Sequence, residues 1–90
     1  MQGWEWVTAA RVITHKPCRL LGLVVTGSAG DGEVTVYDGE NDTAPTILNI
    51  FLATRNSRSF NFPGGIQTER GLYIGNFSHV TGVLVRWEVD

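Results

Sequence analysis

The residues best suited to acid–base or nucleophilic chemistry are two histidines and one cysteine. A hydrolytic site needs a nucleophile, a base and an orienting acid that the fold brings together. His15 stands beside a proline and His79 in a second turn, and neither belongs to a recognisable catalytic motif. Cys18 opens an apolar segment, where a free cysteine behaves as a small buried apolar residue. The sequence therefore predicts no catalytic residue, and we expect a protein that is not an enzyme.

Acidic residues gather in one stretch and raise the question of a calcium site: Asp31, Glu33, Asp38, Glu40 and Asp42. Hard cations need several oxygens at close spacing. An EF-hand loop counted from Asp38 needs glycine at its sixth position and glutamate at its twelfth, which are Thr43 and Asn49 here. Solvated carboxylates in turns are the better interpretation, and a site of another type built from the loops stays an open alternative. We expect no bound metal or cofactor.

Size and charge limit the possible partners. Ninety residues suffice for one domain, residues 1–90, with a single core of modest size. Seven basic and nine acidic residues give a net charge of -2 without a block of either sign, so neither nucleic acid nor a membrane is an expected partner. The single cysteine cannot form an internal disulfide, which favours synthesis in a reducing cytoplasm. The first residues lack the basic and apolar regions of a signal peptide.

Alternating apolar residues, interrupted by Gly, Pro, Asn and Asp, are typical of short β-strands. The pattern predicts seven strands, at residues 4–14, 18–26, 33–37, 46–53, 58–62, 71–75 and 80–89. A helix is the competing interpretation of residues 4–14, but the β-branched and aromatic residues there favour a strand. The spacing of the strands predicts an all-β fold, a compact antiparallel β-sandwich with jelly-roll or Greek-key connections.

The composition of individual segments gives finer expectations. Residues 18–26 are apolar on both faces, with Leu20 and Val24 sharing one of them, which predicts a central strand. We expect this strand to form a hairpin with residues 33–37, and the long polar connection 38–45 to cross between sheets. Pro63-Gly64-Gly65 is expected to end a strand, and the short segment 71–75 to lie at a sheet edge.

Aromatic residues are the remaining guide to function. Trp87 continues an alternating row with Val83 and Val85, and we expect this row in the core. Trp4 and Trp6 share one face near a chain end, and tryptophan is enriched both in cores and at interfaces. Outward apolar residues on other strands would leave exposed area that association could cover. The predicted interface residues are Trp4, Trp6, Tyr37, Phe51 and Leu84.

Four segments carry a resemblance to known proteins: CRLLGLVVT at 18–26, EVTVYDG at 33–39, FNFPGG at 60–65 and ERGLYI at 69–74. In these the chain resembles short β-sandwich proteins from the structural gene clusters of tailed bacteriophages, of the capsid decoration (cement) type. The resemblance covers most of the chain from Arg11 onward and transfers no functional residue. It implies a non-enzymatic virion protein, made in the host cytoplasm, that caps or bridges capsomers, often as a homotrimer.

The resemblance also implies the partners: further copies of the chain, and the major capsid protein or another virion protein. The alternative is a ligand-binding module, of the carbohydrate-binding type, on a phage fibre or receptor-binding particle. An exposed flat platform formed by Trp4, Trp6 or Tyr37 beside polar residues would favour this alternative. A convex surface whose aromatic side chains are covered between subunits would favour the decoration protein.

Overall fold

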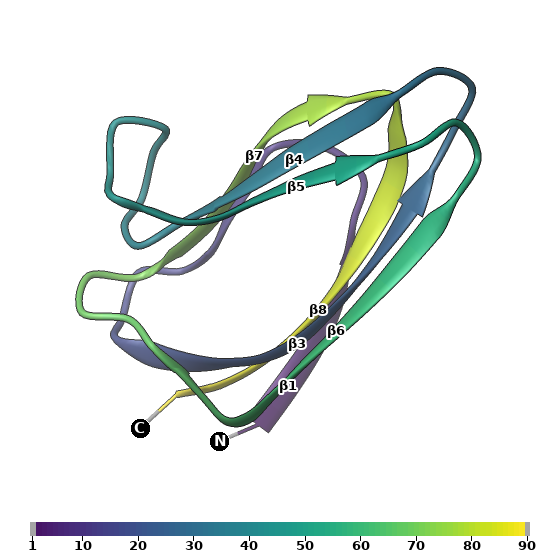
Figure 1. Cartoon of the computed structure of the whole chain (residues 1–90). Coiled ribbons are helices and arrows are strands. Elements are labelled where there is room, and N and C mark those ends of the chain that lie inside the picture. Colours follow the sequence, from purple (N-terminus) through teal and green to yellow (C-terminus); the bar gives the residue numbers. More distant parts are fainter. Residues whose placement is uncertain (1, 90) are drawn as a thin grey trace.

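The computed structural model describes residues 2–89, and these form eight antiparallel strands and no helix. The strands pack as two layers with loops gathered at the two ends of the sandwich (Figure 1). Their bounds are β1 (Gln2–Val7), β2 (Arg11–Thr14), β3 (Cys18–Gly27), β4 (Gly32–Tyr37), β5 (Thr46–Leu52), β6 (Ser57–Gln67), β7 (Leu72–Ser78) and β8 (Val80–Val89).

The strand order is β1-β8-β3-β6 in one sheet and β2-β7-β4-β5 in the other. The chain changes sheets at every connection except the one between β4 and β5. Eight strands wired in this way form a jelly roll. The predicted sandwich is therefore confirmed, with eight strands in place of seven.

The extra strand arises within residues 4–14, which the sequence predicted as one strand. The chain bends at residues 8–10, so that β1 pairs with β8 in one sheet and β2 pairs with β7 in the other. Thr8, Ala9 and Ala10 are exposed and small enough to form this corner without displacing the core. The sequence runs through the bend without a glycine or proline to mark it, which is why the pattern concealed it.

Two predicted connections are wrong. β3 and β4 lie in different sheets and do not form a hairpin. β4 pairs instead with β5 from Gly32–Leu52 to Tyr37–Thr46, so the connection 38–45 is a long hairpin loop and not a crossover. A hydrogen bond from Asp38 N to Pro45 O, 2.8 Å long, closes the base of this loop. The polar residues of the loop form turns within it, such as the hydrogen bond from Thr43 N to Oδ1 of Asn41. A long polar connection therefore did not have to cross between the sheets.

Two expectations about strand limits are also wrong. β7 lies between β2 and β4 and is not an edge strand. β6 continues through Pro63-Gly64-Gly65, where the register with β3 breaks between the pairs Leu20–Ile66 and Gly22–Asn61. Because β6 is an edge strand, proline at this irregularity costs no hydrogen bond within the sheet.

The same irregularity changes the faces of β3. Leu20, Leu23 and Val25 are buried between the sheets, whereas Val24 is half-buried on the outer face. The expectation that Leu20 and Val24 share a face is therefore wrong, because the break in register at Leu20–Gly22 shifts the alternation by one residue. The central position of β3, between β8 and β6, is confirmed.

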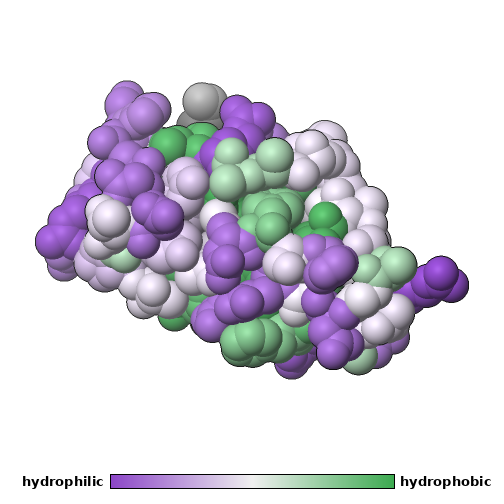
Figure 2. All heavy atoms as spheres, turned by 90° about the horizontal axis from the view of Figure 1, so that it is seen from above, coloured by the Kyte–Doolittle hydropathy of each residue, from purple (hydrophilic) through white to green (hydrophobic). Residues whose placement is uncertain are grey.

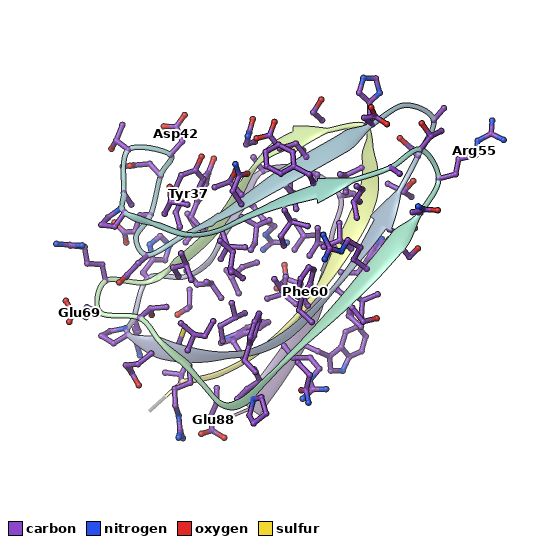
Figure 3. All side chains as sticks on the ribbon, in the orientation of Figure 1. Tyr37, Asp42, Arg55, Phe60, Glu69 and Glu88 are labelled. Carbon is purple, nitrogen blue, oxygen red and sulfur yellow. The ribbon has the colours of Figure 1, made fainter. Side chains whose placement is uncertain are left out.

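The core fills the space between the two sheets. Val83 and Val85 are almost inaccessible to solvent, which confirms that part of the predicted row. Trp87 is half-buried and packs against the core, with its ring over Gly3. Phe60 points into the space between the layers (Figure 3). The other core residues are Val7, Cys18, Leu20, Leu23, Val25, Val34, Val36, Ile50, Leu52, Leu72 and Ile74.

Candidate interaction surfaces

The first candidate surface is the outer face of the β1-β8-β3-β6 sheet. Trp6 on β1 pairs with Leu84 on β8, and Leu84 pairs in turn with Val24 on β3. Residues directly opposite each other in antiparallel strands have adjacent side chains on one face. Trp4 stands two residues before Trp6 on the same face. We call Trp4, Trp6, Leu84 and Val24 the indole surface.

A glycine holds one indole in place on this surface. A Cβ atom added at Gly82 would lie 2.3 Å from Cζ2 of Trp6, so the ring of Trp6 occupies the space that a side chain at position 82 would take. Trp6 is 44% exposed, while Trp4 is 70% exposed and pairs with Arg86. The indole surface therefore offers one fixed ring and one largely free ring to a partner.

The β1 strand that carries both indoles is part of the sheet. It pairs with β8 along its whole length, and its last residue, Val7, is 1% exposed. Its inward residue Glu5 forms an ion pair with Arg11 of β2, which joins the two sheets at this side of the sandwich. Any contact that Trp4 and Trp6 make with a partner thus starts from a position fixed by the subunit's own fold.

The other two predicted interface residues lie on the opposite sheet. Tyr37 packs against Tyr73 with ring centroids 5.7 Å apart. Phe51, on the edge strand β5, is 61% exposed and pairs with Glu33 at the other end of β4. Figure 2 views the molecule from the side of this sheet and shows apolar areas divided by hydrophilic ones. The structure therefore brings Trp4, Trp6 and Leu84 together and separates them from Tyr37 and Phe51.

The second candidate surface is a hollow of about 640 Å³ at one end of the sandwich. It lies between the β4–β5 loop, the β2–β3 connection and the β6–β7 turn. Gly71 allows these segments to meet, because a Cβ atom there would lie 2.7 Å from the carbonyl oxygen of Thr14 and 3.1 Å from that of Gly39. The labelled residues Asp42 and Glu69 mark this end in Figure 3, and Arg55 marks the opposite end.

Polar contacts fix the loops around the hollow. The Asp38 carboxylate accepts hydrogen bonds from the backbone N–H groups of Glu69 and Arg70, at 2.9 to 3.1 Å. Nδ1 of His15 contacts the carboxylate of Glu40, which joins the β2–β3 connection to the β4–β5 loop. Charged groups bonded in this way hold backbone segments more firmly than neutral groups do. These contacts join the three connections that surround the hollow.

The groups suited to catalysis or metal binding are dispersed. His79 lies in the β7–β8 connection, with its ring over Gly30, at the opposite end from His15 (Figure 1). Two residues of the acidic stretch have structural roles: Asp38 accepts hydrogen bonds from backbone amides, and Glu40 contacts His15. Among residues 2–89, no three histidine, cysteine, aspartate or glutamate side chains form a group that could hold a metal ion.

Cys18 has the structural position that the sequence predicted. It is fully buried, and its backbone N–H donates to Oγ1 of Thr68 over 3.0 Å. The Thr68 backbone N–H donates in return to the Cys18 carbonyl over 2.8 Å. Sequence reasoning missed Thr68, which resembles an ordinary loop residue until the fold places it against the start of β3. It also missed Gly82, whose importance depends on the indole above it.

The described part of the chain, residues 2–89, holds no helix long and apolar enough to cross a membrane. Comparisons of the chain with models of protein families, with curated proteins and with solved structures found no match.

Proposed function

We propose that this protein is a non-enzymatic virion protein of the capsid decoration type, which binds the major capsid protein and further copies of itself. The observation that carries the proposal is the indole surface on the outer face of one sheet, with Trp4 70% and Trp6 44% exposed. Large aromatic side chains at interfaces contribute much of the binding free energy. The resemblance to phage decoration proteins supports the same role.

The expected mechanism is burial of the indole surface at a junction between subunits. A tryptophan hides about 150 to 250 Å² when it is covered completely, so these two residues would supply a sizeable part of a small interface. Decoration proteins bind a closed shell in many copies, and association into a homotrimer would join several weak contacts into one strong attachment. The site of action is the virion, after synthesis in the host cytoplasm.

A second candidate function is a carbohydrate-binding module of a phage fibre or receptor-binding particle. The exposed ring of Trp4 beside Arg86 favours it, since a flat aromatic ring next to a polar group can stack on a sugar and bind its hydroxyls. The two functions make different use of the same residues. A decoration protein covers the rings with protein, whereas a sugar-binding module keeps them open.

Capsid binding by point variants tests the proposal. Deleting the first residues is unsuitable, because β1 is a paired strand of the sheet and its loss would damage the fold. We expect Trp4→Ser, at the more exposed indole, to keep the thermal midpoint near that of the native protein. Combined with Trp6→Ser, which also loses the packing on Gly82, it should leave the protein folded and lower sedimentation with capsids at least tenfold. Val12→Ser, on the outer face of the other sheet, is the matched control and should bind normally.

Mass analysis of purified virions provides the second test. The proposal expects the protein in many copies per particle, and in a fixed ratio to the major capsid protein. A protein absent from virions, or present only at the copy number of a fibre, would contradict the decoration role. Equal capsid binding by the native protein and the double tryptophan variant would contradict the assignment of the indole surface.

A further inference from the structure

Polar side chains line the hollow at the end of the sandwich where the β2–β3, β4–β5 and β6–β7 connections meet. Its lining combines a histidine, an acid, an amide and a guanidinium group: His15, Glu40, Asn41 and Arg70. Figure 2 shows hydrophilic side chains gathered at this end of the molecule, on the left of the view. Its volume of about 640 Å³ lies within the range of roughly 300 to 1,000 Å³ that is typical of small-molecule sites.

Several hydrogen-bonding groups in the lining stay available to a ligand. Oδ1 of Asn41 accepts from the backbone N–H of Thr43 over 3.0 Å and from its hydroxyl, which leaves the Asn41 amide nitrogen as a donor. Within residues 2–89 the Arg70 side chain has no hydrogen bond or ion pair. One carboxylate oxygen of Glu40 contacts His15, and the other remains an acceptor. Donors and acceptors therefore stand side by side around one space.

The charges of the lining indicate a ligand without net charge. An anion that approached Arg70 would meet the carboxylate of Glu40, and a cation that approached Glu40 would meet the guanidinium of Arg70. A polyhydroxyl compound avoids both conflicts, because each hydroxyl group can donate as well as accept. Ala44 and Pro45 add apolar surface to the lining, against which the C–H groups of a sugar ring can pack.

We propose that this hollow is a binding site for a neutral sugar. The donors would be the Arg70 guanidinium and the Asn41 amide, and the acceptors would be Glu40 and His15. The inference does not rest on the proposed function, because the two sites are separate. The hollow lies at one end of the sandwich, and the indole surface lies on the outer face of the β1-β8-β3-β6 sheet. A protein held to a capsid by its indole surface would keep the hollow open to solvent.

The test is titration of the isotope-labelled protein with glucose, galactose, mannose and N-acetylglucosamine, followed by NMR. We expect at least one sugar to give saturable amide shifts at residues 15, 39–45 and 70. Arg70→Asn and Glu40→Gln should each lower the affinity for that sugar at least tenfold, with thermal midpoints close to native. Arg55→Asn is the matched control, because Arg55 lies at the opposite end and asparagine tolerates its positive φ of 60°.

Three outcomes would overturn the inference. The first is that no sugar gives saturable shifts, and the second is equal binding by the native protein and Arg70→Asn. The third is that shifts centre on Trp4 and Trp6, which would assign sugar binding to the indole surface. Sodium acetate serves as an anionic probe, and tighter binding of acetate than of every sugar would also contradict a neutral ligand. Capsid binding by the tryptophan variants is measured separately, so failure of one proposal leaves the other standing.

Discussion

The hydroxyl group of Thr68 offers a sharp test of how the loop end is attached to the core. Thr68 is 1% exposed, and its Oγ1 accepts a hydrogen bond from the Cys18 backbone N–H over 3.0 Å. The same oxygen lies 3.3 Å from the Cys18 carbonyl, to which it donates. Thr68→Val keeps the shape of the side chain and removes only this polar group. Thr68→Ser keeps the hydroxyl group and removes a methyl group.

The two variants separate hydrogen bonding from packing. Loss of a hydrogen bond to a buried group costs about 1 to 3 kcal/mol, which we expect for Thr68→Val. Loss of one buried methyl group costs about 1 kcal/mol, which we expect for Thr68→Ser. For a domain of this size, each kcal/mol lowers the thermal midpoint by about 4 to 8 °C. The expected order of stability is native, then Thr68→Ser, then Thr68→Val.

Calorimetry and urea denaturation, each on all three proteins, measure this order. The backbone hydrogen bond from Thr68 N to the Cys18 carbonyl is present in every variant, so it does not affect the comparison. If Thr68→Val proved as stable as Thr68→Ser or more so, packing of the methyl group would outweigh the hydroxyl, and the reasoning would be refuted.

Three further expectations concern the indole surface, the core and metal binding. Gly82→Ala should displace the Trp6 ring, because the new Cβ atom would lie 2.3 Å from Cζ2; a change in tryptophan fluorescence checks this, and an unchanged spectrum would contradict it. Trp87→Ala should lower the free energy of unfolding by about 2 to 3 kcal/mol. This is less than the roughly 3 to 5 kcal/mol lost with a fully buried aromatic residue, because Trp87 is half-buried. A urea midpoint equal to that of the native protein would argue against the packing of Trp87 on the core. Treatment with EDTA should leave the thermal midpoint unchanged, and one equivalent of zinc in elemental analysis would show that the expected absence of a metal site is wrong.

Local sequence patterns were sufficient to identify most of the strands. Val83 and Val85 were placed in the core correctly, because a strand with one buried face alternates with a period of two and that period is visible in the residues themselves. The burial of Cys18 was expected from its residue type, since free cysteines are among the most buried side chains. The all-β sandwich followed from the same periodicity and from turn residues between the segments. For the candidate sites, the pattern also showed that Trp4 and Trp6 share a face.

Only the tertiary structure decided which strands pair. The partners β1 and β8, β2 and β7, and β3 and β6 are far apart in the chain, and alternation within a strand specifies its faces but not its neighbours. For this reason the corner at residues 8–10, the shifted faces of β3 and the central position of β7 were not visible in the sequence.

The candidate sites depend on the same long-range contacts. Register between β1 and β8 places Leu84 opposite Trp6, with Gly82 below the ring, while Tyr37 and Phe51 lie on the other sheet. The hollow requires three connections that meet at one end of the sandwich, where Asp38 binds the backbone of the β6–β7 turn. Residue types determined what each surface could bind, and the packing of distant segments determined which residues share a surface.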